Sequence, residues 1–448
     1  MARISRVLAA IIVAFAIGAC GSDSSLPVAT GKASIRMINA IPTSPEIGFL
    51  IEERALDAVR YKSNSSPESW DDLEYTFNFE INRPFENELT RIASQFLDVT
   101  REIEYTFLVR GSLDAAVVDV WQIPERSFSG SETIFEMRVG NAADALGLVD
   151  VYVGLEGVDP VLGEQVASLA PGEVSAPTDI EDDVYVVTIT AAGDPANILF
   201  QSVPTRILAN QSVIVTAFAG DANDTAPVTV RLFNQLGASS AVTDARFPPT
   251  ARLIHATSDL GTSDVYDDAA LQNRIVADLA FGDITGDIDV AVGEVPITAT
   301  APGNVGAILL EDTLTTFAGS RLNYYLTVLS DEVVGSQVFV DRRPVETIAR
   351  LTFFHSAINH ELVDLYVVDA GTTIDDVFPR LITATYGLQA SEIRLDAGSY
   401  EIYVTTAGEK TILDGPVSLE VALGDVFEAV LLDRVDPSLA EFKLFPPL

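Results

Sequence analysis

The sequence is poor in the residue types that carry covalent and metal chemistry. Its 448 residues contain one cysteine, three histidines and four lysines. A single thiol excludes an intrachain disulfide, so the fold must be stabilised by buried apolar area. Acidic residues outnumber basic ones by 65 to 27, for a formal net charge of −38. A surface of this sign repels phosphate backbones, and we expect no nucleic-acid partner.

The N-terminus has the layout of an export signal. Two arginines precede an apolar run over residues 7–15, which is too short to span a bilayer and indicates a cleaved signal peptide at residues 1–19. The small residues before Cys20 resemble a bacterial lipobox, and that resemblance implies lipidation of this cysteine. Residues 20–32 then form a polar, flexible tether. An aspartate directly after the lipidated cysteine would favour inner-membrane retention. Because Gly21 stands at this position, we expect an outer-membrane lipoprotein. The alternative is an ordinary signal peptide with an incidental cysteine.

The remainder of the chain has the composition of a globular protein. Hydrophobic residues make up 48% of the sequence and the mean hydropathy is +0.27, which excludes intrinsic disorder. Beyond the signal peptide no long uninterrupted apolar stretch occurs, so the apolar residues are expected in soluble cores. The length allows about three or four domains.

Internal repeats organise the chain. One pattern of six residues, with a polar residue at the fifth position, opens four segments at residues 35–40, 137–142, 251–256 and 351–356. In three of the copies an aspartate follows nine residues after the polar residue, and Gly48 stands there in the first copy. Later strands and turns recur as well. Because the copies begin about 100 residues apart, each copy is expected to form one structural unit.

Short strands with period-two alternation, separated by Gly, Pro and Asp turns, predict an all-β fold. We expect four tandem Ig-like or Greek-key β-sandwich domains arranged as a rod. The best candidate for a helix is 86–96 in the first copy. The predicted domains are a divergent first repeat at 33–130 and further repeats at 134–240, 249–344 and 348–448.

Two segments also carry a family resemblance. Ala251–Ala256 and Ala397–Thr405 follow the pattern small-Arg-apolar-apolar-His-Ala and Ala-Gly-x-Tyr-x-Ile-x-Val-Thr. This resembles the bacterial repeat known as domain of unknown function 4397. The resemblance covers about half of the chain, and the second copy departs from it with asparagine in place of histidine. It implies Ig-like sandwiches on exported proteins, with no assigned activity.

The recurrent polar residues form one candidate constellation. A strand, a loop and a return strand fit between the members of each pair, so the two side chains are expected to meet. An acid/base or metal pair is one reading, and a hydrogen bond that fixes the loop is the other. Because asparagine and glycine replace members in some copies, the structural bond explains the set better. The pairs are Asn141 with Asp150, His255 with Asp264, and His355 with Asp364.

Metal and cofactor motifs are weak throughout. Residues 283–294 have acidic residues at several EF-hand positions but lack the required glycine, where Ile288 stands. Asp264, Asp267 and Asp268 are the remaining candidates for calcium at a loop edge. No cofactor and no metal are predicted.

Catalysis is not supported either. The sequence has no Gly-x-Ser-x-Gly elbow and no glycine-rich phosphate loop. Trp70 and Tyr61, in a polar loop predicted over 61–72, are candidates for a glycan-stacking platform, whereas Trp121 is expected in the core.

Taken together, the sequence predicts a non-enzymatic, lipid-anchored cell-envelope protein that acts in surface binding, adhesion or envelope scaffolding. The membrane is a partner through the N-terminal lipid, and an envelope, cell-surface or glycan partner is expected in addition. A glycan-binding accessory module for polysaccharide capture is the main alternative. A hydrolase built on the second or fourth repeat is a further one.

Overall fold

A computed structural model describes residues 28–86, 88–157, 163–329, 332–387 and 392–445. In these ranges the regular structure is β-strand, apart from 3-10 turns such as Asp144–Leu146 and Ser258–Leu260. The strands form eight sheets of four or five strands, and pairs of sheets enclose four hydrophobic cores. The all-β sandwich prediction is therefore confirmed. We name the sandwiches 1 to 4 in chain order, while the exact domain limits stay a prediction from the repeats.

Sandwich 1 covers residues 32–124. Its inner sheet has the order β4-β1-β7-β8 and its outer sheet the order β3-β2-β5-β6. Phe49, Phe77 and Phe107 are fully buried between the two sheets. The strands are β1 (Lys32–Asn39), β2 (Ile47–Ile51), β3 (Arg54–Val59), β4 (Glu68–Asp71), β5 (Glu74–Arg83), β6 (Glu88–Asp98), β7 (Ile103–Ser112) and β8 (Ala115–Pro124).

Sandwich 2 covers residues 134–242. Its inner sheet runs β12-β9-β16-β17-β18, and its outer sheet runs β11-β10-β13-β14 with β15 paired to β13. The strands are β9 (Ile134–Asn141), β10 (Val149–Leu155), β11 (Glu164–Leu169), β12 (Thr178–Glu181), β13 (Asp183–Ala191), β14 (Asp194–Gln201), β15 (Thr205–Ile207), β16 (Ser212–Ala219), β17 (Val228–Asn234) and β18 (Ser239–Val242).

Sandwich 3 covers residues 250–338. Its inner sheet runs β22-β19-β25-β26 and its outer sheet β21-β20-β23-β24. The strands are β19 (Thr250–His255), β20 (Ser263–Tyr266), β21 (Arg274–Leu279), β22 (Ile288–Asp289), β23 (Gly293–Ala301), β24 (Asn304–Thr316), β25 (Arg321–Leu329) and β26 (Glu332–Val338).

Sandwich 4 covers residues 349–444. Its inner sheet runs β30-β27-β33-β34 and its outer sheet β29-β28-β31-β32. The strands are β27 (Ala349–His355), β28 (Leu362–Asp369), β29 (Leu381–Thr385), β30 (Ile393–Leu395), β31 (Gly398–Thr406), β32 (Ile412–Val421), β33 (Val426–Asp433) and β34 (Ala440–Leu444).

The opening strand of each repeat is central in its inner sheet. β1, β9, β19 and β27 each pair in parallel with the strand that follows the outer-sheet hairpin, namely β7, β16, β25 and β33. Alternate residues of an opening strand therefore point into its own core, and the others point out of the sandwich. The outward residues meet a second sandwich, which explains why β1 is buried on both faces from Ile35 to Asn39.

The sandwiches pack in pairs through their inner sheets. Ile38, Leu108 and Trp121 of sandwich 1 share one apolar cluster with Ile214, Phe218 and Phe233 of sandwich 2. Ile254, Tyr325 and Val338 of sandwich 3 do the same with Phe354, Val430 and Leu432 of sandwich 4.

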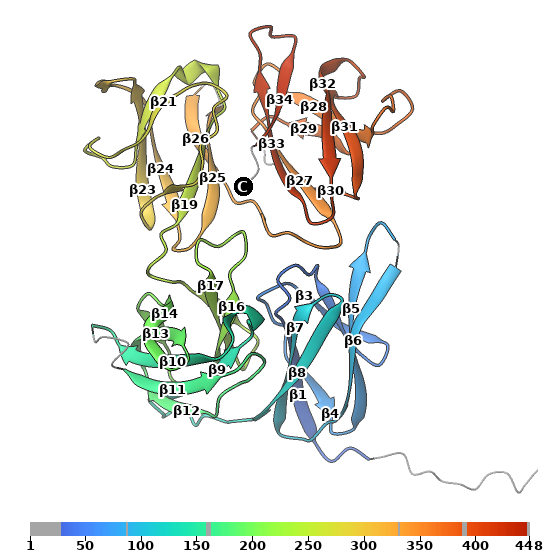
Figure 1. The fold of residues 1–448 in the computed structure, drawn as a ribbon, viewed down its shortest axis with the longest axis vertical. Helices are drawn as coiled ribbons and strands as arrows, with labels where there is room; N and C mark the ends of the chain where they lie inside the picture. The colour runs from blue at the N-terminus through green and yellow to red at the C-terminus, as the bar shows by residue number, and fades with distance from the viewer. Residues whose placement is uncertain (1–27, 87, 158–162, 330–331, 388–391, 446–448) are drawn as a thin grey trace, which may run out of the picture.

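The four sandwiches form two rows of two (Figure 1), with sandwiches 1 and 2 in the lower row and 3 and 4 above them. The predicted rod is therefore wrong. Period-two alternation shows which residues of a strand face its own core, but not what covers the opposite face. On the inner sheets, the second face is covered by the neighbouring sandwich.

The predicted helix at 86–96 is also wrong, because β6 occupies this segment and pairs with β5 along its whole length. A register shift between Phe79 and Glu80 leaves one residue of β6 unpaired. Such a bulge moves the alternation by one position and produces an apparent helical spacing of apolar residues.

Candidate functional site

The polar residue at the fifth position of the opening strand closes the turn that follows. His255 Nε2 lies 2.6 Å from the main-chain oxygen of Gly261. The equivalent bond of His355, to the turn residue His360, measures 2.7 Å. That of Asn141, through its amide nitrogen, measures 2.9 Å. A carbonyl oxygen only accepts, so in each case the side-chain nitrogen carries the proton.

The recurrent aspartate fixes a different segment, the tip of an outer-sheet hairpin. Asp264 accepts a hydrogen bond from the N–H of Gly303 at 3.0 Å. The equivalent bonds of Asp364 and Asp150 measure 2.8 and 2.7 Å. The three glycines that donate have φ between 68° and 73°, a region that side chains rarely adopt.

The members of each pair therefore bind separate backbone segments, and no hydrogen bond joins them in the described part of the chain. The prediction that the two side chains of a pair meet is therefore wrong. Each of these side chains instead fixes a turn or a hairpin through its own hydrogen bond to the main chain. Burial lowers the pKa of His355 to about 4, and burial also lowers that of His255. Both imidazoles are neutral near pH 7, and the Nε2 proton of each is already donated to a main-chain oxygen.

The two aromatic residues considered for glycan stacking lie apart. Tyr61 is buried between sandwiches 1 and 2, and its hydroxyl donates to the main-chain oxygen of Ala219 at 2.7 Å. It is thus not available for stacking in this structure. Trp70 lies in edge strand β4 rather than in a loop, partly buried, with Arg54 5.1 Å from its ring centre.

The acidic residues considered for calcium do not converge. Asp264 is bound as described above, and Asp268 accepts from the N–H of Asn273 at 2.7 Å. Asp267 accepts from the amide of the same asparagine, also at 2.7 Å. Over the described residues, no group of three or more Cys, His, Asp or Glu side chains is placed to hold a metal ion.

Cys20, the predicted lipidation site, lies outside the described residues. Among the residues that are described, the structure has no helix that is both long and apolar enough to cross a membrane.

The outward positions of the opening strands contain charged groups as well as apolar ones. Arg36, at the second position of the first copy, is 1% exposed. It pairs with Glu104 within sandwich 1 and donates to the main-chain oxygen of Asn234 in sandwich 2 at 2.7 Å. Lys62 adds a second polar link between these sandwiches, as ion pairs with Asp221 at 2.9 Å and with Asp224.

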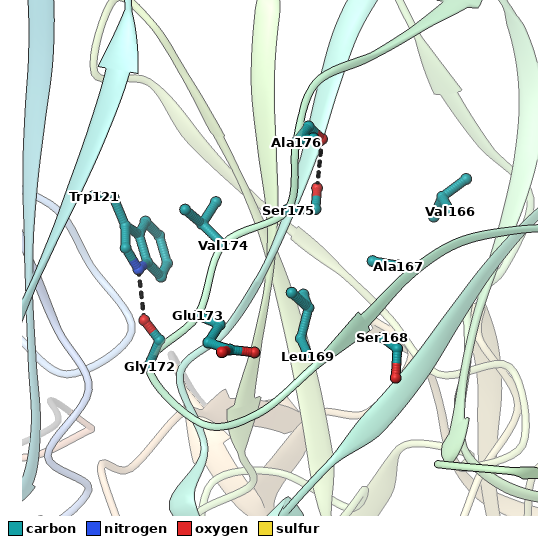
Figure 2. Close-up of a pocket in the computed structure, with 10 residues that line it drawn as sticks. All are labelled: Trp121, Val166, Ala167, Ser168, Leu169, Gly172, Glu173, Val174, Ser175 and Ala176. Atoms are coloured by element: carbon teal, nitrogen blue, oxygen red, sulfur yellow. Dashed lines mark hydrogen bonds between the residues drawn. The ribbon is translucent and has the colours of Figure 1, made fainter.

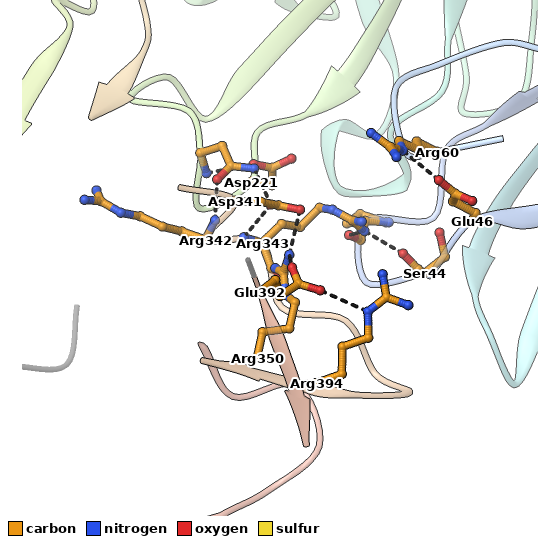
Figure 3. Close-up of polar contacts among 12 residues, drawn as sticks. Ser44, Glu46, Arg60, Asp221, Asp341, Arg342, Arg343, Arg350, Glu392 and Arg394 are labelled. Atoms are coloured by element: carbon orange, nitrogen blue, oxygen red, sulfur yellow. Dashed lines mark hydrogen bonds and ion pairs between the residues drawn. The ribbon is translucent and has the colours of Figure 1, made fainter. Parts of the chain in front are cut away.

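The linker between sandwiches 3 and 4 joins all four sandwiches through three consecutive residues, Asp341, Arg342 and Arg343, which are labelled in Figure 3. Arg342 donates to Asn323 of sandwich 3 at 2.7 Å and to Glu428 of sandwich 4 at 3.0 Å. Its side chain is only 1% exposed, and Glu428 is 5% exposed. Removing either of these two charges would leave the other buried and unpaired, which is strongly destabilising.

The residues on either side of Arg342 reach the lower row. Asp341 accepts from the side chain of Asn223 in sandwich 2 at 2.8 Å. Arg343 donates to the main-chain oxygens of Pro42 and Ser44 in sandwich 1, at 2.9 and 2.6 Å. We call residues 341–343 the junction tripeptide. The sequence indicated this segment only as the end of the third repeat, predicted at residue 344.

A cleft of about 420 Å³ opens beside the junction tripeptide. Residues of sandwich 1, the linker and sandwich 4 form its walls, and its charged residues are four arginines and three carboxylates. A second hollow, of about 460 Å³, lies on sandwich 2 beside Trp121 (Figure 2). The indole N–H of this tryptophan is already bonded to the main-chain oxygen of Gly172 at 2.8 Å, and the tryptophan belongs to the interface, as expected for a core residue.

Comparison with known proteins gives little further guidance. No family model matches the chain, and no curated protein sequence matches it either. Among solved structures, the Bacillus anthracis TIE protein is similar over 90% of this chain and 68% of its own, at 10% identity and a TM-score of 0.15. A likeness at this level supports no conclusion about the function of this chain.

Proposed function

We propose that the chain is a lipid-anchored, non-enzymatic cell-envelope protein that acts as a scaffold for surface binding or adhesion. The observation that carries this proposal is the junction tripeptide, because it ties four sandwiches into one block. A block held by buried ion pairs presents its outer sheets and loops in a fixed arrangement. That is a property of a scaffold rather than of a flexible array.

The engagement of the recurrent polar residues supports the non-enzymatic part of the proposal. The histidines and aspartates that recur are bound to main-chain groups inside the repeats. Their repetition is thereby explained by turn and hairpin geometry. The repeats thus need no reaction to account for their shared residues.

The short tether supports a position close to the membrane. Residues 21–27 separate Cys20 from Val28, the first described residue, and seven residues span at most about 25 Å. β1 enters sandwich 1 at the end of the block away from sandwiches 3 and 4 (Figure 1). The anchor thus holds the lower row at the membrane, and the upper row faces outward.

The test uses cells that lack the native chain and express the wild type, Cys20→Ala or the tether control Ser24→Ala. We expect the wild type and the control in the outer-membrane fraction, and cell adhesion with both. Cys20→Ala should move to the soluble fraction and abolish adhesion. Membrane fractionation or adhesion that is unaffected by this change would contradict the proposal. Turnover of ester, peptide or glycoside substrates that His355→Ala abolishes at an unchanged melting temperature would contradict its non-enzymatic part.

A further inference from the structure

The cleft beside the junction tripeptide differs in charge from the rest of the molecule. The whole chain has a formal charge of −38. In this cleft, Arg60, Arg343, Arg350 and Arg394 face three carboxylates, so that its charged lining has one more positive than negative group. It lies where two sandwiches and a linker meet, and its volume of about 420 Å³ is in the range of small-molecule sites.

Two of these arginines have unused donors. Arg60 is bound through Nε to Glu46 at 2.7 Å, and Arg394 is bound through Nε to Glu392 at 3.1 Å. Their side chains are 78% and 64% exposed. Within the described residues, their Nη1 and Nη2 groups have no partner. Each carboxylate thus orients a guanidinium while leaving free the paired donors that match an oxyanion.

The cleft wall also contains two buried polar atoms without a partner, Thr347 Oγ1 and Arg350 Nε. Thr347 is 5% exposed and Arg350 is 4% exposed. Buried polar atoms in native proteins are nearly always hydrogen-bonded, so both need an explanation. Thr347 lines the same cleft as the free guanidinium donors, and a hydroxyl together with cationic donors suits a ligand that has both an anionic group and hydroxyls.

We propose that this cleft binds a sugar acid, whose carboxylate is held by Arg60 and Arg394 and whose hydroxyls face Thr347. Apolar wall residues such as Pro45 and Pro84, which are half-buried, would cover the less polar face of the sugar ring. The proposal goes beyond the scaffold function and does not depend on it. The net negative charge of the chain is screened beyond about 8 Å at physiological ionic strength, so the local arginines dominate at the cleft.

The test is calorimetric titration of glucuronate into the full-length protein in detergent at 0.15 M salt. Glucose serves as the neutral comparison and sulfate as the simple anion. We expect glucuronate to bind, glucose not to bind, and sulfate to bind at least tenfold more weakly. The double variant Arg60→Gln/Arg394→Gln should weaken glucuronate binding at least tenfold. Arg206→Gln is the matched control, since this arginine is 62% exposed and pairs with one carboxylate in sandwich 2.

The proposal is overturned if the wild type shows no glucuronate binding, or if the double variant binds as the control does. Sulfate binding as tight as that of glucuronate would show an anion site without sugar recognition and would also overturn it. Thr347→Val gives a second test, since it removes a hydroxyl that has no protein partner and should leave the fold intact. It should lower glucuronate affinity severalfold without changing sulfate affinity, and an unchanged glucuronate affinity would remove Thr347 from the site. Adhesion and fractionation of the cells report separately on the scaffold function.

Discussion

Arg343 donates from Nη1 to the main-chain oxygen of Ser44 at 2.6 Å, across 299 residues of sequence. This bond connects the linker before the last repeat to the turn after the first strand of the first repeat. Together with the bonds of its two neighbours, it makes the third linker a contact point for every sandwich. The two rows thus meet through a few polar side chains, together with main-chain bonds such as that from Thr225 to Gly319 at 3.1 Å.

Replacing Arg343 should loosen the contact between the rows. Arg343→Met removes a charged donor from two carbonyl oxygens, and hydrogen bonds from charged groups contribute about 1.5–3 kcal/mol each. Small-angle scattering should show a larger radius of gyration, and protease should cut the linker faster. Arg206→Met, at an exposed arginine on sandwich 2, should change neither measurement. Unchanged scattering for both variants would mean that the other contacts between the rows, such as the main-chain bond from Thr225 to Gly319, hold them without Arg343.

The interface between sandwiches 1 and 2 depends on the absence of a side chain at Gly140. A Cβ atom there would lie 2.5 Å from Cη2 of Trp121. Gly140→Ala therefore forces the tryptophan to move, and overpacking of this kind destabilises a protein by about 1–3 kcal/mol. The melting temperature should fall, and the double variant with Trp121→Leu should recover part of that loss.

Gly286→Ala is the matched control for this prediction. Nothing lies within 4 Å of the position of its Cβ, so its melting temperature should match the wild type. If Gly140→Ala and Gly286→Ala behave alike, then Trp121 adjusts freely and the interface is softer than the structure indicates. A double-mutant cycle gives the coupling energy between positions 140 and 121 directly.

Much of the fold could be predicted from the sequence because the repeats recur in register. The opening strands lie in the structure where the repeated pattern places them. The packing of one sandwich on another could not be predicted. Alternate residues such as Ile38 and Ile254 are apolar in a way that also fits the core of a single sandwich, and nothing local distinguishes the two faces.

The buried arginines of the opening strands and the cleft could not be predicted from the sequence either. Arg36, Arg138 and Arg252 recur at the second position of the opening strand, and this signal was present in the sequence. All three are buried, at 1%, 8% and 4% exposure. An arginine next to apolar residues is most simply predicted to face solvent. Its role at an interface depends on a carboxylate far away in the chain, which the local pattern does not show. The cleft beside residues 341–343 similarly depends on side chains from three distant segments.

The buried histidines should make stability depend on pH. The pKa of His355 is lowered to about 4 by burial, which outweighs the opposing effect of its hydrogen bond to the main chain of His360. In the unfolded chain its pKa is near 6.5. As the pH falls from about 6.5 to about 4, the unfolded state binds a proton that the folded state does not, so stability decreases over this window. Above pH 6.5 the contribution is constant.

His355→Asn isolates this effect, because Asn141 makes the equivalent hydrogen bond to the turn in the second copy. The free energy of unfolding, measured by urea titration at pH 7 and pH 4.5, should fall less in this variant than in the wild type. His355→Ala also removes the slope, but it should destabilise the protein at both pH values because the turn loses its donor. Equal pH slopes in the wild type and His355→Asn would contradict the assigned burial effect.

The pair of Arg36 and Glu104 permits a test of what a buried charge does at the interface. Arg36→Met leaves Glu104, which is 7% exposed, without its cation. Such an unpaired buried charge destabilises a protein by about 3–5 kcal/mol. The double variant Arg36→Met/Glu104→Leu removes both charges and should recover most of that loss in urea unfolding. The fourth copy already has Thr352 at the equivalent position, so the arginine is not required for the strand to form. If the double variant stays as unstable as Arg36→Met, the bond from Arg36 to the main-chain oxygen of Asn234, rather than the ion pair, holds sandwiches 1 and 2 together.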